Sequence, residues 1–177
     1  MTDDSEHRTP HALFGTPMPD DPTLPGGAIP QTEVATALVP DPEIGPLVGI
    51  IVGDNTDLAV MSIAEEVLRD AGVPFEVSVM SAHLDPGKLA NYCKGARERG
   101  LRVLIAGAGL SAALPGVAAA YTDLPVIGVP LTSHLSAAGG LDALLSIAQM
   151  PPGVPVATVG IDNAKNAAHL ALRILSI

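Results

Sequence analysis

The sequence predicts an α/β fold in which a parallel sheet of about five strands carries helices on both faces. From Leu47 onward, short continuous apolar runs of strand length alternate with segments of helical periodicity. Buried strands that alternate with helices are typical of parallel sheets joined by right-handed crossovers. Aromatic side chains make up only 2% of the 177 residues and Trp is absent. We therefore expect a core of Ala, Val, Leu and Ile, which suits closely packed layers.

Each predicted strand is followed by its helix. The first strand is expected over residues 47–53 and the first helix over 57–72, with Gly72 as its end. The apolar side chains of this helix share one face, namely Leu58, Met61, Ala64, Val67 and Leu68. The later strands are expected over 75–81, 102–109, 125–131 and 154–161, and their helices over 85–100, 111–122, 140–150 and 164–175. This order predicts a flavodoxin-like three-layer sandwich.

Residues 1–45 are expected to be an extension, and residues 46–177 a single domain. Nine of the 17 prolines and eight of the 19 acidic side chains fall within residues 1–46, where Arg8 is the one basic residue. No sustained hydrophobic period runs through this segment. We expect it to be flexible or to dock on a neighbouring subunit.

Charge, hydropathy and cysteine usage exclude several classes of function. The net charge of −10 argues against nucleic acid as a partner, because such binding needs clustered Lys and Arg. The sequence shows no apolar stretch of membrane-spanning length and no signal-like start, so we expect a cytoplasmic protein with no membrane partner. Cys93 is the single cysteine, which excludes an internal disulfide, and its position within a predicted helix favours a packed side chain over a nucleophile.

Four segments follow the carboxyl ends of predicted strands, where a parallel sheet of this kind binds its ligands. They are residues 53–57, 81–86, 107–116 and 132–140. In the first segment, Asp54 or Thr56 can cap the next helix, and capping explains these residues as well as an anion site does. The Gly-rich third segment matches neither a dinucleotide motif nor a nucleoside triphosphate motif, and tight helix packing is a serious alternative explanation for its glycines.

Histidines lie in two of these segments. His83 stands between a strand and a helix, where an imidazole can exchange a proton near neutral pH, so we expect it to be an acid/base group. His134 is a second candidate in the fourth segment, although a surface histidine is the simpler interpretation. No metal is expected, because the only candidate ligands follow no ligand-spacing motif; these are His83, Asp85, Asp54 and Asp57.

Six stretches, taken in order, resemble one known family. They read VGIIVGDNTDLAVM, GVPFEVSVMSAHLDP, GLRVLIAGAGLSAALPGVAAA, LPVIGVP, GLDALLSIAQMPPGVPVATVGI and NAAHLALRIL, and they span essentially Leu47 to Ile177. On these motifs the chain is identified as a member of the superfamily of N5-carboxyaminoimidazole ribonucleotide mutases and aminoimidazole ribonucleotide carboxylases, often called PurE.

The resemblance implies a flavodoxin-like subunit of a homo-octamer, with active sites at subunit boundaries and neither a metal nor an organic cofactor. It implies a lyase or isomerase of purine biosynthesis that moves a carboxyl group on an aminoimidazole ring. Carbon dioxide leaves the exocyclic nitrogen and is added to the adjacent ring carbon. His83 matches the family's proton shuttle, since that carbon must lose a proton to a base.

Asp57 matches a residue that contacts the ribose of the family's substrate. The substrate-binding residues expected from the first three loops are Gly53, Asp54, Asn55, Thr56, Asp57, Ser81, Ala82, Leu84, Ala108, Gly109, Leu110 and Ser111.

Three loops depart from the family pattern. Asp54 replaces a serine in the first loop, and Leu84 replaces an arginine that binds the substrate phosphate. In the third loop, Leu110 replaces a glycine and Ala113 a histidine. A site that loses a positive charge and gains a negative one attracts a phosphate less strongly. The sequence therefore favours a carboxylase, decarboxylase or carboxyl-migrating mutase that acts on a small, non-phosphorylated heterocyclic or related carboxylate, with His83 as the acid/base.

Two alternatives stay open. One is a genuine mutase of purine biosynthesis that holds its phosphate with backbone N–H groups and Thr56. The other is an inactive paralogue that binds a metabolite. The fourth loop is also about two residues longer than is usual in the family, and His134 in that insertion is a candidate to compensate for the histidine replaced by Ala113.

Overall fold

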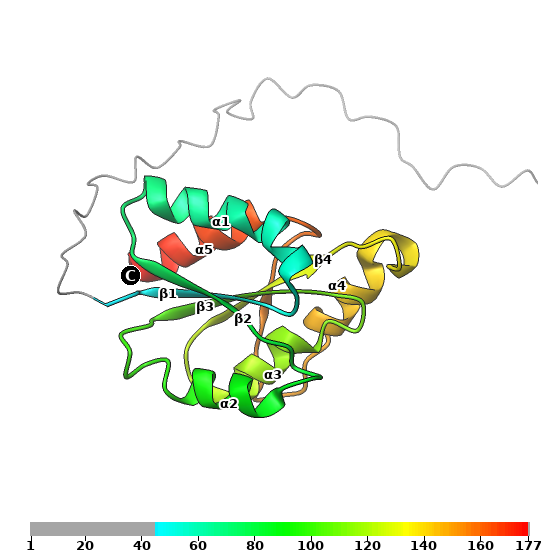
Figure 1. Cartoon of the computed structure of the whole chain (residues 1–177), viewed down its shortest axis with the longest axis horizontal. Coiled ribbons are helices and arrows are strands. Elements are labelled where there is room, and N and C mark those ends of the chain that lie inside the picture. The colour runs from blue at the N-terminus through cyan, green and yellow to red at the C-terminus, as the bar shows by residue number, and fades with distance from the viewer. Residues whose placement is uncertain (1–44, 177) are drawn as a thin grey trace, which may run out of the picture. The chain divides into compact units, whose positions relative to one another are not determined.

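A computed structural model describes residues 45–176; the predicted extension lies almost entirely outside the described residues. Within this range, five strands form one sheet in the order β2-β1-β3-β4-β5 (Figure 1). Every neighbouring pair of strands is parallel, which confirms the predicted fold class. The strands are β1 (Val48–Val52), β2 (Phe75–Val79), β3 (Val103–Gly109), β4 (Val126–Leu131) and β5 (Ala157–Thr158).

Helices cover both faces of the sheet (Figure 1). One layer holds α1 (Leu58–Asp70) and α5 (Ala164–Leu175), which pack against each other. The opposite layer holds α2 (Pro86–Lys94), α3 (Ala113–Tyr121) and α4 (Leu141–Ala148). Two 3-10 turns, η1 (Asn55–Asp57) and η2 (Ala137–Gly140), precede α1 and α4. None of the helices in residues 45–176 is long and apolar enough to cross a bilayer.

Alternate side chains of the strands pack into two apolar clusters, one on each face of the sheet. On β1, Val48, Ile50 and Val52 pack with the α1/α5 layer, whereas Ile51 packs with the opposite layer. All five residues of β1 and all six of β4 are buried. Because both faces are covered, these strands appear in the sequence as continuous apolar runs, not as alternating ones.

Two elements are shorter than the sequence predicts. The helix expected over 85–100 ends at Lys94, because Gly95 leaves the helical conformation and a series of turns follows. The strand expected over 154–161 is reduced to Ala157–Thr158. Residues 151–154 close a turn in which the Val154 N–H donates to the Pro151 carbonyl at 3.1 Å, and Pro155 has no N–H to give to a strand partner.

The parallel arrangement brings the carboxyl ends of β1, β2, β3 and β4 to one edge of the sheet. The loops that leave these ends are the four segments that the sequence analysis selected. The chain passes from each loop into a helix or 3-10 turn on one face or the other, so the loops converge on a single region.

Candidate functional site

A pocket of about 250 Å³ lies at this edge and is formed by all four loops. The second and fourth loops contribute only residues close to the ends of their strands, whereas the first and third loops contribute residues along most of their length. The lining residues are Gly53, Asp54, Thr56, Asp57, Ser81, Ala82, His83, Ala108, Gly109, Leu110, Ala112, Ala113, Leu114, Thr132 and Ser133.

The first loop is held by Asp54, which caps the turn η1. The Thr56 N–H donates to Asp54 Oδ1 at 2.8 Å, and the Asp57 N–H donates to the Asp54 carbonyl at 3.2 Å. Hydrogen bonds from Thr56 lower the pKa of the Asp54 carboxyl. The Thr56 N–H is therefore taken by the Asp54 carboxylate and the Asp57 N–H by the Asp54 carbonyl, so neither is free for an external anion at this turn.

Asp57 is partly buried beside the pocket. Burial raises the pKa of its carboxyl, and the negative charge of Asp54 acts in the same direction. No salt bridge compensates for the water that the Asp57 carboxylate loses on burial, because the three salt bridges formed within residues 45–176 involve other carboxylates. The ionised Asp57 carboxylate is therefore destabilised by its surroundings when no ligand is bound, and it can accept hydrogen bonds from a ligand.

The second loop forms a tight turn that fixes the backbone of His83. Ser81 Oγ accepts hydrogen bonds from the N–H groups of His83 at 3.3 Å and Leu84 at 3.2 Å. Asp85 Oδ1 then accepts from the Lys88 N–H at 2.9 Å and caps α2. His83 lines the pocket, whereas Leu84 is 89% exposed and does not line it.

The third loop contains two non-glycine residues in left-handed conformations, Leu110 with φ 55° and Ala112 with φ 35°. The Ala112 N–H closes the loop on the Gly109 carbonyl at 2.9 Å, and the hydroxyl of Ser146 on α4 donates to the Ser111 carbonyl. A Cβ disfavours this backbone region, so the loop wall of the pocket is held in a conformation that its residues do not prefer.

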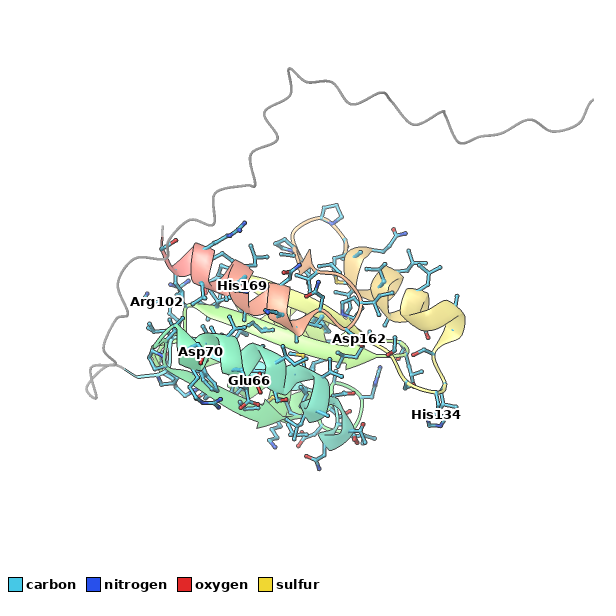
Figure 2. All side chains as sticks on the ribbon, turned by 90° about the horizontal axis from the view of Figure 1, so that it is seen from above. Glu66, Asp70, Arg102, His134, Asp162 and His169 are labelled. Atoms are coloured by element: carbon cyan, nitrogen blue, oxygen red, sulfur yellow. The ribbon has the colours of Figure 1, made fainter. Side chains whose placement is uncertain are left out.

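The fourth loop contributes Thr132 and Ser133 to the pocket. Figure 2 shows His134 at the outer tip of this loop, away from the sheet. The side chain of His134 is exposed and does not line the pocket of this chain.

Most of the predicted site residues are thus brought together, and four are not. Asn55, Leu84, Ser111 and His134 lie in the correct loops but outside the lining. Four lining residues were not singled out in the sequence, namely Ala112, Leu114, Thr132 and Ser133, and Ala113 was noted only as the replacement of a family histidine. Their place directly after a strand or at the start of a helix is the signal that could have found them. The roles of all these residues in binding stay predictions.

The lining has an acidic character. Asp54 and Asp57 bring two carboxylates, and the described residues that line the pocket include neither Lys nor Arg. Within residues 45–176 there is no group of three or more His, Cys, Asp or Glu side chains that could hold a metal ion.

A five-stranded parallel sheet with this strand order, covered on both faces and with a pocket at its carboxyl edge, defines a flavodoxin-like α/β protein. Its sequence matches the family model described as AIR carboxylase over residues 47–177. The chain therefore belongs to the AIR carboxylase, or PurE, family, as the sequence motifs predicted.

Curated relatives are similar over most of the folded region. N5-carboxyaminoimidazole ribonucleotide mutases are 60% identical over 132 residues in Pyrococcus horikoshii, covering 75% of this chain and 73% of that protein, and 59% identical over 133 residues in Aquifex aeolicus, covering 75% and 78%. The phosphoribosylaminoimidazole carboxylase of Candida albicans is 52% identical over 144 residues, which are 81% of this chain but 25% of that protein. A crystal structure of Treponema denticola PurE matches with a TM-score of 0.64 and 30% identity, covering 74% of this chain and 80% of that one.

Proposed function

We propose that this protein is a carboxyl-transferring mutase that acts on N5-carboxyaminoimidazole ribonucleotide. The 60% identity to a curated mutase over three quarters of the chain is the observation that supports it most. The pocket supports the same proposal, because His83 and Asp57 reach it from two different loops. This is the alternative that the sequence analysis left open, and the comparisons favour it over a substrate without a phosphate.

The proposed reaction balances without an external proton. The bond between the exocyclic nitrogen and the carboxyl carbon breaks, and its electron pair stays on the nitrogen. The released carbon dioxide is attacked by the adjacent ring carbon, which then loses its proton to His83. The same imidazole returns a proton to the nitrogen, so the net change is an isomerisation. His83 is a suitable group because imidazole exchanges protons near neutral pH.

Replacing His83 by Asn tests the assignment of the base. A positioned acid/base group contributes about 10²- to 10⁴-fold to a rate, so we expect His83→Asn to lower kcat by at least about 100-fold while circular dichroism stays unchanged. His169→Asn is the matched control, because His169 is an exposed histidine on α5 that does not line the pocket (Figure 2). Full activity of the His83 variant would exclude this mechanism.

The family resemblance further implies that the reaction needs neither a metal nor an organic cofactor. Under this proposal, dialysis against a chelator leaves the turnover number unchanged. A loss of activity that added divalent metal restores would show that a metal takes part. Turnover would also distinguish the protein from an inactive paralogue, as would growth rescue of a purine auxotroph that lacks the mutase.

One structural observation still favours the second candidate, a substrate without a phosphate. The Asp54 carboxylate accepts the Thr56 N–H at the turn η1, and Leu84, which stands where the family resemblance expects a phosphate-binding arginine, carries no charge. Calorimetric titration with the ribonucleotide and with the dephosphorylated ribonucleoside separates the candidates. Tighter binding of the ribonucleotide supports the mutase, and binding of the ribonucleoside alone supports a changed substrate.

We also propose a homo-oligomer, an octamer by resemblance, in the cytoplasm. Leu135, Leu141 and Leu145 are 67%, 43% and 48% exposed, and they follow one another from the fourth loop onto α4. Apolar side chains grouped in this way are typical of surfaces that pack against another chain. Light scattering of the full chain tests the octamer, and Leu145→Glu is expected to reduce its mass. A monomer at micromolar concentration would contradict the proposal.

A further inference from the structure

Thr132 follows β4 directly and is held by a residue from the loop before α5. The Thr132 N–H donates to Asp162 Oδ1 at 2.8 Å, and its hydroxyl donates to Asp162 Oδ2 at 2.5 Å. The Asp162 N–H in turn donates to the Pro130 carbonyl at 2.8 Å. Figure 2 shows Asp162 at the carboxyl edge of the sheet, at the base of the loop whose tip carries His134. The carboxylate thus fixes Thr132 through both of its hydrogen-bond donors.

These contacts determine what Thr132 can offer to a ligand. Because the Thr132 hydroxyl donates to Asp162 Oδ2, its proton points toward Asp162. The lone pairs of the oxygen are then what remains for the pocket that Thr132 lines. The methyl group lies close to Gly140, where an added Cβ would come within 2.8 Å of Thr132 Cγ2.

Ser81, in the loop after β2, offers the pocket a hydrogen-bond donor where Thr132 offers an acceptor. Its Oγ accepts the N–H groups of His83 and Leu84, so its lone pairs are engaged and its proton is free to be donated. Both Ser81 and Thr132 line the pocket. A hydroxyl can serve as a hydrogen-bond donor or as an acceptor. Here the backbone N–H groups leave Ser81 as a donor, and the Asp162 carboxylate leaves Thr132 as an acceptor.

We propose that Asp162 is a positioning residue that makes Thr132 an obligatory hydrogen-bond acceptor, and that Thr132 thereby selects the amino group of an aminoimidazole substrate. This inference rests on the proposed function, since it names the substrate group that the same pocket recognises. A site built to accept a hydrogen bond rejects an analogue that lacks the donor, because the acceptor would then be left unpaired.

Asp162→Asn is the decisive variant. Asn has the same size and tolerates the left-handed backbone of residue 162, which has φ 54°. Its amide oxygen can still accept the Thr132 N–H, but its NH₂ group would donate to Thr132 Oγ1 and turn the hydroxyl proton toward the pocket. The Asn variant should therefore keep its fold and reverse the polarity of one contact.

The measurement is the ratio of dissociation constants for aminoimidazole ribonucleotide and imidazole ribonucleotide, which lacks the amino group. We expect the wild-type protein to prefer the amino compound about tenfold to 100-fold, and Asp162→Asn to lose that preference. Thr132→Val should lose it too, and adding Asp162→Asn to that variant should change the ratio no further. A purely structural role for Asp162 would weaken both ligands equally.

The outcomes distinguish the two proposals. If the wild-type protein binds neither ribonucleotide and shows no turnover, the proposed function fails, and this inference fails with it. If the wild-type protein turns over the substrate and Asp162→Asn keeps the full preference for the amino compound, only the role of Asp162 is overturned. A preference that depends instead on the ribose hydroxyls, measured with 2′- and 3′-deoxy ligands, would also overturn the assignment to the amino group.

Discussion

Residues with a Cβ rarely adopt left-handed backbone conformations, and residues 45–176 contain four that do: Leu110, Ala112, Ala138 and Asp162. All four lie between the carboxyl end of a strand and the α-helix that follows it, and Leu110 and Ala112 line the pocket. Strained backbone of this kind persists where the surrounding structure imposes it, and it gathers at functional sites. The distribution of strain therefore agrees with the position of the candidate site.

The energetic cost of the left-handed backbone can be measured at Ala138. It is exposed and has φ 47°, so replacing it by Gly removes the steric cost without removing packed atoms. We expect Ala138→Gly to raise the free energy of unfolding by up to about 1 kcal/mol, as measured by urea denaturation. Ala137→Gly is the matched control, because Ala137 is an exposed neighbour without a positive φ. It should lower stability by about 0.5–1 kcal/mol through chain entropy. Equal effects of the two substitutions would argue against strain at residue 138.

Asp57 gives a prediction of pH dependence. Because burial and Asp54 raise its pKa in the native state, the folded protein binds a proton more tightly than the unfolded chain. As the pH rises from the pKa of Asp57 in the unfolded chain to its higher pKa in the native protein, the free energy of unfolding therefore falls. Above the native pKa the full loss of stability is present. We expect Asp57→Asn to be more stable than the wild type at pH 7 and equal to it near pH 3.5, in urea unfolding curves.

Asp142 supplies a control of opposite sign. The hydrogen bond that the Ala137 N–H donates to Asp142 Oδ2 at 3.0 Å lowers the pKa of this carboxyl, so its contribution to stability is present at neutral pH and lost as pH falls. Asp142→Asn should therefore be the less stable variant at pH 7. A destabilised Asp57→Asn protein at that pH would show that the carboxylate makes favourable contacts that outweigh its burial.

At the scale of elements, α3, α4 and the segment before β5 pack tightly against β4 at Gly128. A Cβ at this position would clash with Ile147 Cγ2 on α4 and would lie 2.9 Å from Val156 Cγ1. Neither neighbour is the free end of a long flexible side chain. We expect Gly128→Ala to lower the free energy of unfolding by about 1–3 kcal/mol, measured by chemical denaturation.

Gly87→Ala is the comparison for that substitution. Gly87 lies in the first turn of α2, and an added Cβ would make an ordinary contact at 3.8 Å with Asp85 Oδ1. The variant should gain up to about 1 kcal/mol, because Ala favours a helix over Gly. If both substitutions had the same effect, close packing at Gly128 would not be what fixes α4 against the sheet.

The helices and strands differ in how strongly their local sequence determines them. Buried parallel strands and capped helices leave local signals, so the layers and the four loops of the pocket could be predicted. β5 could not be delimited, because its length depends on a turn at residues 151–154 and on pairing with Ile127 and Gly128. The left-handed loop at Leu110 and Ala112 was unpredictable from residues that disfavour it. Thr132 was missed because Asp162, which fixes it, lies 30 residues away in the sequence.

At the scale of the whole molecule, charge opposes the binding of an anionic substrate. The chain has a net charge of −10, of which residues 1–46 carry −7 with eight acidic residues and Arg8. The pocket adds Asp54 and Asp57, and its described lining contains no Lys or Arg. Repulsion between these carboxylates and an anionic substrate raises the free energy of their association. Dissolved salt weakens this repulsion, with a screening length of about 10 Å at 0.1 M.

The sign of the salt effect follows from this arrangement. If the ribonucleotide binds to the pocket as described, raising KCl from about 20 to about 150 mM should increase kcat/KM by about twofold to fivefold, because repulsion is screened. The uncharged ribonucleoside should respond less. Sites that bind phosphate through Lys or Arg show the opposite trend, since salt weakens the attraction. A fall in kcat/KM with salt would therefore mean that cations from another subunit outweigh Asp54 and Asp57 in the assembled pocket.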